Sequence, residues 1–102
     1  MSIGKLTQDM NEFVQSKGWY DVDSKRPQTV RNLTVSLSIE AAELLEHVQW
    51  REQPRDVAAF ADELADVLLY TLQIAHVSGI DLEAAVQKKL AINRQRTWDQ
   101  NP

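Results

Sequence analysis

The sequence predicts an all-α protein folded as a four-helix antiparallel bundle, and three observations support this fold class. Four segments place apolar residues at helical spacing, and no segment alternates apolar and polar residues as a strand does. Only 3 glycines and 3 prolines interrupt the 102 residues. Short connections between long helices favour antiparallel neighbours. We therefore expect a single domain over residues 1–102, with a core over about 4–96.

Capping residues set the ends of the four segments. The predicted helices cover about residues 4–17, 29–51, 54–78 and 82–96, and the polar residues 19–28 form a loop. Thr29 and Asp81 suit helix starts, because their side chains accept hydrogen bonds from free backbone N–H groups. Gly18 and Gly79 suit helix ends, since glycine readily adopts the left-handed conformation that follows a helix. Pro54 is expected to open the third helix.

The third helix is apolar on more than one side. Phe60, Leu64, Val67 and Ile74 share one side, and Leu68, Leu69 and Leu72 lie nearly opposite. A helix that is apolar all round is normally covered all round, and one small bundle covers only about half of it. We therefore expect a homo-oligomer, a dimer or a tetramer, with this helix at its centre.

Composition narrows the function classes. The formal net charge is −4, which argues against broad electrostatic binding to nucleic acid or to an anionic membrane. No cysteine is present, so neither a disulfide framework nor a thiolate metal site can form. The N-terminal residues lack the regions of a signal peptide, and no apolar run approaches the roughly 20 residues that cross a bilayer. A soluble, cytoplasmic protein is expected.

Glu40 stands in an apolar stripe of the second helix. The residues that project within about 80° of it on one side are Leu33, Leu37, Leu44 and Val48. An ionised carboxylate buried alone would cost many kcal/mol, so this side chain requires a partner. Glu43 follows one helical turn later and projects about 60° away, so both carboxylates can converge on one ion.

The third helix repeats this pattern with Glu63 and Asp66, again three residues apart and beside inward apolar positions. Two antiparallel helices would bring these four carboxylates towards one place. Like charges at that range disfavour ionisation, and a hard cation such as Mg²⁺, with Mn²⁺ as a substitute, resolves the conflict through oxygen ligands. One such pair is usually a solvated helix face, but two pairs within apolar stripes favour a metal site.

Further side chains lie near the glutamates of the second helix. Asn32, Ser36 and His47 project near Glu40 and Glu43, and Trp50 lies about 80° from Glu40 on the Glu43 side. Either ring alone would usually be a packing residue, but an aromatic ring beside a metal site is also a stacking surface for a base. Trp19, in the preceding loop, is a further candidate for this role.

One face of the fourth helix combines apolar residues with the polar side chains of Lys89, Asn93 and Arg96. The cations on this face have two possible roles. The two cations either extend from the edge of the apolar stripe into solvent or bind phosphate oxygens, for which arginine is well shaped. Cations next to an acidic cluster suit a polyphosphate held through Mg²⁺.

Three segments closely resemble the MazG-like nucleoside triphosphate pyrophosphohydrolases. They are NLTVSLSIEAAELLEHVQW, DELADVLLYTLQIA and GIDLEAAVQKKLAINRQR. The resemblance covers about residues 26–96 and is closest to the short, single-domain branch that includes the dCTP pyrophosphatases. It implies the all-α MazG-like fold, oligomers of two or four subunits, and a Mg²⁺-dependent site. That site would cleave nucleoside triphosphates, favouring deoxynucleotides such as dCTP, to the monophosphate and pyrophosphate for house-cleaning or nucleotide-pool control.

By motif position, the resemblance also implies residue roles. The metal ligands, which are also the catalytic residues, would be Glu40, Glu43, Glu63 and Asp66. The substrate-binding residues would be Asn32, Trp50, Lys89, Asn93 and Arg96. Apart from the resemblance, Trp19 and His47 are further candidates to hold the base.

Two other functions remain open. In a non-catalytic helical interaction module, the acids would form structural ion pairs with Lys89 and Arg96. A di-iron carboxylate bundle is disfavoured, because that site takes a Glu-x-x-His motif on two helices, and neither acid pair has a histidine three residues on. Pyrophosphate release with and without Mg²⁺ would separate these functions.

Overall fold

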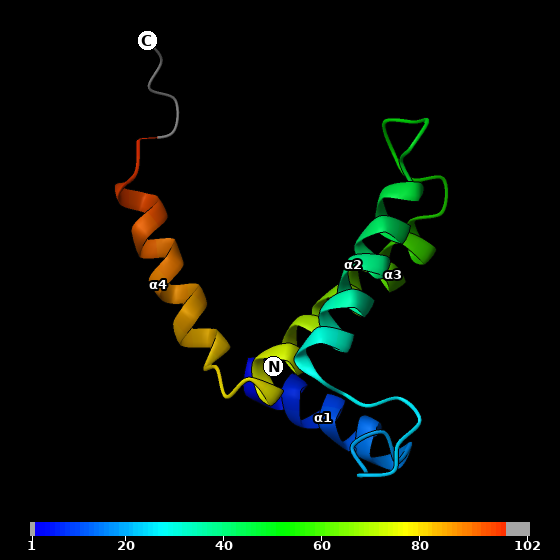
Figure 1. Cartoon of the computed structure of the whole chain (residues 1–102). Coiled ribbons are helices and arrows are strands. Elements are labelled where there is room, and N and C mark those ends of the chain that lie inside the picture. The colour runs from blue at the N-terminus through cyan, green and yellow to red at the C-terminus, as the bar shows by residue number, and fades with distance from the viewer. Residues whose placement is uncertain (1, 98–102) are drawn as a thin grey trace.

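The chain is all α-helical, as the sequence predicts (Figure 1). The computed structural model describes residues 2–97. Its helices are α1 (Ile3–Ser16), α2 (Val30–Glu46), α3 (Val57–Val77) and α4 (Leu82–Gln95). No strand occurs between residues 2 and 97, and the polar segment between α1 and α2 is a loop, as expected.

Both predicted start caps are confirmed. The Oγ1 of Thr29 accepts a hydrogen bond from the backbone N–H of Asn32 at 3.1 Å. The Oδ1 of Asp81 accepts one from the backbone N–H of Ala84 at 3.0 Å. Each bond satisfies a donor of the first helical turn that has no partner inside the helix.

The two glycines end their helices as predicted. Gly18 has φ 72° and Gly79 has φ 68°, both in the left-handed region. Beyond Gly79, the N–H of Ile80 donates to the carbonyl of Ala75 at 2.8 Å, which is the hydrogen bond of a glycine-terminated helix end. A side chain at either glycine would strain the backbone.

Two helix boundaries differ from the prediction. α2 ends at Glu46 rather than at Trp50 or Arg51, because the residues after it form tighter turns with hydrogen bonds between residues three apart. α3 begins at Val57 because the Oδ1 of Asp56 accepts from the N–H three residues later, at 3.0 Å. Pro54 therefore lies before the helix and does not open it.

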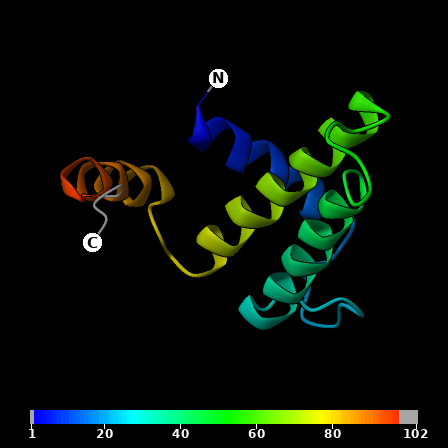
Figure 2. The ribbon, with the colours of Figure 1, turned by 90° about the horizontal axis from the view of Figure 1, so that it is seen from above.

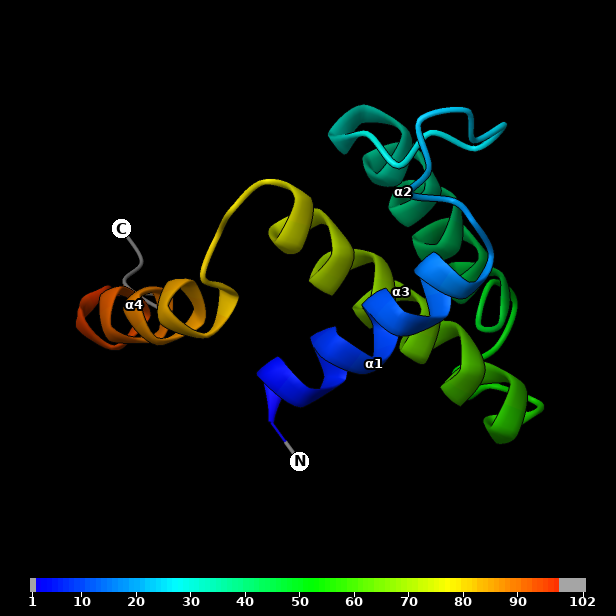
Figure 3. The same cartoon turned by 90° about the horizontal axis from the view of Figure 1, so that it is seen from below.

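α3 is the central helix of the packed part of the chain. α2 runs antiparallel to it, and α1 crosses it (Figure 3). The core joins Met10 and Val14 of α1 to Leu72 of α3, all three at most 5% exposed. Leu33 of α2 is also buried. This packing fixes the relative position of the faces of α2 and α3 that carry the acids.

The predicted four-helix bundle is not closed within one chain, which corrects that expectation. α4 contacts the core through its first residue, Leu82, and then extends away from the other helices (Figures 1 and 2). The radius of gyration is 16.6 Å, whereas a compact domain of this length has about 13 Å. The physical reason is that the turn at Gly79 directs α4 outward, so its apolar residues stay uncovered.

Much apolar surface is consequently exposed. Among the described residues, 5 hydrophobic side chains are buried, while 15 large ones are exposed. The latter include Leu64 and Leu68 of α3 and Val86 and Leu90 of α4. None of the helices is long and apolar enough to cross a membrane over the part of the chain that is described.

Candidate active site

Three carboxylates from two helices converge. Glu40 and Glu43 stand one turn apart on α2, and Glu63 faces them from α3. One carboxylate oxygen of each lies within 4.8 Å of those of the other two, and all three side chains are half-buried. The antiparallel packing of α2 on α3 produces this cluster, as the spacing of the acids predicts.

The cluster is electrostatically strained. The pKa of Glu40 is raised from 4.5 to about 7. The largest cause is burial of the carboxyl group; hydrogen bonding to Glu63 and Glu43 and repulsion by Glu43 and Asp66 add to it. The Oε2 atoms of Glu40 and Glu63 are shielded from solvent, and no N–H or O–H group of the described residues donates to them. A proton shared between carboxyl groups, an ordered water or a cation would satisfy these oxygens, and of these the cation also offsets the shared negative charge.

This donor set fits a hard divalent cation. It consists of carboxylate oxygens alone, which suit Mg²⁺ or Mn²⁺ better than zinc. No lysine or arginine between residues 2 and 97 lies within 4.0 Å of these carboxylates; the ion pair that this range contains joins Lys5 to Asp9. Structural ion pairs with α4 of the same chain thus do not neutralise the cluster.

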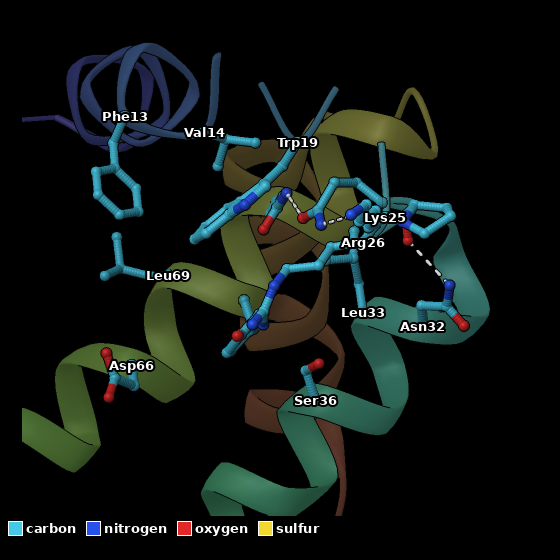
Figure 4. A pocket seen from close by; sticks show the side chains of 14 residues that line it. Phe13, Val14, Trp19, Lys25, Arg26, Asn32, Leu33, Ser36, Asp66 and Leu69 are labelled. Atoms are coloured by element: carbon cyan, nitrogen blue, oxygen red, sulfur yellow. Dashed lines mark hydrogen bonds between the residues drawn. The ribbon is translucent and has the colours of Figure 1, made fainter. Parts of the chain in front are cut away.

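Asp66, the fourth predicted ligand, lies beside the cluster rather than in it. Its oxygens are not within 4.8 Å of all three other acids, and its side chain is exposed. It is nevertheless close enough for its charge to raise the pKa of Glu40. Asp66 also lines a cavity of about 370 Å³ (Figure 4), so it joins the acid cluster to that cavity.

The cavity has a volume of about 370 Å³ and lies between α1, α2, α3 and the loop that follows α1. Trp19 and Asn32, both predicted substrate-binding residues, belong to its wall. The full lining comprises Phe13, Val14, Trp19, Lys25, Arg26, Pro27, Gln28, Asn32, Leu33, Ser36, Asp66, Leu69, Tyr70 and Gln73. Its size and its mixture of apolar and polar groups are those of a small-molecule site.

One wall of the cavity is aromatic. The rings of Phe13 and Trp19 meet edge to face, with centroids 5.6 Å apart. The Cζ of Arg26 lies over the Trp19 ring at 5.9 Å from its centroid, within the range of a cation–π contact. Figure 4 shows Arg26 reaching from the loop into the cavity. This wall offers flat surfaces to a ligand.

Another part of the wall is polar and held by hydrogen bonds. Gln73, only 4% exposed, donates through Nε2 to the Oε1 of Gln28 at 2.6 Å. Asn32 donates through Nδ2 to the carbonyl of Pro27 at 2.9 Å. The loop is therefore attached to both α2 and α3 by side-chain amides, which fixes the shape of the cavity.

A second hollow, of about 300 Å³, lies at the acids themselves. Its lining residues are Glu43, Glu46, His47 and Glu63. His47, a predicted base-binding candidate, packs against Phe60 edge to face at 5.7 Å. Both hollows therefore border the acids, Asp66 lining the larger of the two and Glu43 and Glu63 the smaller.

Four other predicted site residues do not join the cluster in one chain. Trp50 is 88% exposed and lines neither hollow. Lys89 and Asn93 belong to α4, and Arg96 follows it. Because α4 extends away from α2 and α3 (Figure 1), these residues and the acids lie on separate arms of the molecule.

The sequence analysis missed most of the cavity wall. Tyr70 and Gln73 lie one and two turns beyond Asp66, and extending the acid stripe along the third helix would have found both. Ser36, which the sequence places near Glu40 and Glu43, does belong to the wall. Lys25 and Arg26 carry no comparable periodic signal, because they belong to a loop whose course depends on the fold.

The sequence of this chain is similar to a known protein family and to several named proteins. A family model described as MazG-like matches residues 35–101. Rat (Rattus norvegicus) dCTP pyrophosphatase 1 is 35% identical over 94 residues, which cover 83% of this chain and 52% of that protein. A dATP/dGTP diphosphohydrolase of Salmonella phage PMBT28 is 36% identical over 83 residues, which cover 79% of this chain and 24% of the phage protein. The chain spans about half the length of the dCTP pyrophosphatases that it matches.

A solved structure shares the fold. The crystal structure of a pyrophosphatase from Archaeoglobus fulgidus has a TM-score of 0.76 and 35% sequence identity to this chain, and the match covers 90% of this chain and 88% of that one. The family match includes both acid pairs and all of α4. The chain therefore belongs to the MazG-like family.

Proposed function

We propose that this chain is a Mg²⁺-dependent nucleoside triphosphate pyrophosphohydrolase. It cleaves deoxynucleotides such as dCTP to the monophosphate and pyrophosphate, in house-cleaning or control of the nucleotide pool. The observation that carries the proposal is the convergence of Glu40, Glu43 and Glu63 beside a cavity large enough for a nucleoside. The relatives named for dCTP and for dATP and dGTP support a deoxynucleotide substrate.

The positions of the two hollows suggest how the substrate lies. The base occupies the large cavity against Trp19, since an aromatic ring is a stacking surface for any base. Asp66 borders this cavity, and its charge is close enough to raise the pKa of Glu40. A nucleotide with its base in the cavity would therefore have its α-phosphate next to the acid cluster. The remaining phosphates extend over Glu43 towards His47.

Hydrolysis replaces one bond to the α-phosphorus by another. The oxygen of a water molecule bonds to the α-phosphorus as the bond to the bridging oxygen breaks, and the electron pair of that bond leaves on pyrophosphate. A bound Mg²⁺ would neutralise phosphate charge and lower the pKa of the attacking water. Glu40, Glu43, Glu63 and Asp66 would hold the cation, and a carboxylate of this set accepts the proton that the water loses.

We further propose that a homodimer or tetramer completes the site. The surface accessible to solvent is 8071 Å², about 2,000 Å² more than a compact monomer of 11.7 kDa exposes. This excess is comparable with the area that each subunit of an obligate dimer buries. The exposed leucines of α3, Leu64 and Leu68, supply apolar surface for such an interface.

In this assembly, α4 of one subunit covers the α2–α3 face of another. Its exposed Val86 and Leu90 provide the apolar contact. Lys89, Asn93 and Arg96 then reach the phosphates of the partner's site, where the cations stabilise the departing pyrophosphate. The outward course of α4 supports this arrangement, since the same residues lie apart from the acids of their own chain.

The experiment is pyrophosphate release from each common deoxy- and ribonucleoside triphosphate, with and without Mg²⁺. Wild type is expected to release pyrophosphate only with Mg²⁺. Glu40→Gln and Glu63→Gln should each lose about 100-fold or more of the rate while retaining a helical circular-dichroism spectrum. The matched control is Glu52→Gln, at an exposed position outside both hollows. Near-wild-type rates in both site variants would remove the proposed site.

The result also tests the non-catalytic alternative. An interaction module predicts no pyrophosphate release from any nucleotide and no rise in melting temperature on adding Mg²⁺. The solvent-shielded oxygens of Glu40 and Glu63, which no donor satisfies, favour the metal-dependent enzyme instead.

A further inference from the structure

Arg26 occupies an unusual place in the large cavity. Its Cζ lies over the ring of Trp19, 5.9 Å from the centroid. No acidic residue in the described range pairs with it, and the guanidinium lies against the ring instead. A guanidinium is planar, weakly hydrated and able to stack on an aromatic face.

The backbone around Arg26 is fixed, whereas its side chain is free to adjust. The N–H of Arg26 donates to the Oγ of Ser24 at 3.0 Å, and its carbonyl accepts from the Nε2 of Gln28 at 2.6 Å. Pro27 follows and restricts the next φ angle. The base of the side chain is thus anchored, while rotation about the side-chain bonds lets the guanidinium move without disturbing the loop.

A nucleobase between the two groups needs room on both of its faces. A planar ring between two others requires about 3.5 Å on each side, the ordinary contact distance of carbon atoms, or about 7 Å in total. The Cζ of Arg26 lies 5.9 Å from the centroid of the Trp19 ring, which is less than that total. The guanidinium must therefore move outward, and lie parallel to the indole, for one base to enter between them.

We propose that Arg26 and Trp19 clamp the nucleobase of the substrate between the guanidinium and the indole ring. This proposal rests on the function proposed above and adds Arg26 as a base-binding residue. A clamp of this kind contacts the faces of the base, which every base presents, and not its edges. It raises affinity for all nucleotides by a similar factor, and the amides of the polar part of the wall contact the edge.

The clamp predicts that the planar shape of Arg26 matters, not only its charge. Arg26→Lys keeps the charge and Arg26→Met keeps much of the length of the side chain, but both remove the planar guanidinium group. Each is expected to raise KM for every deoxynucleoside triphosphate about 3- to 30-fold, with little change in kcat. The same factor should appear in the Kd for a deoxynucleoside monophosphate, measured by titration calorimetry.

Two further substitutions make the test decisive. Arg31→Lys, on the exposed surface of α2 and outside the cavity, is the matched control and should leave KM and Kd unchanged. Lys25→Met removes the neighbouring cation of the cavity, which has no ring contact among the described residues. If Arg26 served only to attract phosphate, Arg26→Lys would retain the wild-type KM and Lys25→Met would raise KM as much as Arg26→Met. That result would overturn the clamp.

The outcomes separate the clamp from the proposed activity. A wild type that binds deoxynucleoside monophosphates but releases no pyrophosphate would refute the enzyme, and the clamp would then be judged from the Kd values alone. A wild type that hydrolyses substrate while both Arg26 variants keep wild-type KM and Kd would refute the clamp and leave the enzyme intact. Absence of all nucleotide binding by the wild type would refute both.

Discussion

The raised pKa of Glu40 makes a specific prediction about stability in the absence of divalent cations. The perturbation is Glu40→Gln, which replaces the carboxyl group by a neutral amide of nearly the same shape. In the wild type, the carboxyl shares its surroundings with Glu43 and Glu63, so ionising it brings negative charge into an acidic, partly buried cluster. The variant removes that cost, and its unfolding free energy should exceed that of the wild type at pH 8.

The sign and the pH window follow from the two pKa values. The pKa of Glu40 is about 7 in the folded chain and 4.5 without the fold. Below pH 4.5 both states hold the proton and the contribution to stability is complete; as pH rises from 4.5 to 7, the folded state alone keeps the proton, and the contribution is lost. The full interval corresponds to about 3 kcal/mol, which partial exposure of the side chain reduces to about 1–2 kcal/mol.

The assay is urea unfolding of wild type and Glu40→Gln in a chelator, at several pH values between 4.5 and 8 and at one protein concentration. The stability difference should grow from near zero at the acidic end to about 1–2 kcal/mol at pH 8. Adding Mg²⁺ at pH 8 should raise wild-type stability by mass action and raise that of the variant much less.

One result would refute the reasoning. If wild type and Glu40→Gln lose stability in parallel between pH 4.5 and 8, the carboxyl groups do not compete for one proton, and the cluster is not strained. Glu52→Gln is the control, since Glu52 is exposed and lies outside the cluster. It should show no pH-dependent difference from the wild type.

Three further substitutions test other parts of the structure. Leu68→Glu places a charge on the exposed apolar face of α3; it should shift the assembly to monomers in analytical ultracentrifugation and lower activity with it, whereas an unchanged sedimentation coefficient would contradict the interface. Gly79→Ala should lower the unfolding free energy by about 1 kcal/mol, because alanine is strained at φ 68° although its side chain meets open space; an unchanged urea midpoint would show that the turn can relax. Gln28→Ala leaves the buried amide of Gln73 without its acceptor and should cost about 1–2 kcal/mol in the same measurement, with the exposed Gln53→Ala as control.

The acid cluster could be predicted almost completely from the sequence. Glu40, Glu43 and Glu63 follow helical spacing within apolar stripes, so the helical period alone places them on the buried edges of two helices. An antiparallel pair of long helices then brings the edges together. Asp66 follows the same rule but sits closer to solvent, because the cavity opens next to it.

The cavity could not be predicted in the same way. Its aromatic and cationic wall depends on the loop that contains Trp19, Lys25 and Arg26, and a loop has no period from which its course follows. The contacts that place it, such as the hydrogen bond between Gln28 and Gln73, join residues 45 positions apart. Such contacts arise only when the helices have packed.

By itself, the sequence determined the helices, their caps and the acidic stripes, because each depends on residues within one or two turns of each other. The start at Thr29 and the ends at Gly18 and Gly79 are local in this sense. Only the tertiary structure decided that α4 leaves its own bundle and that the loop builds a cavity beside the acids. Both outcomes depend on which apolar surfaces meet, a competition between distant segments that no local pattern encodes.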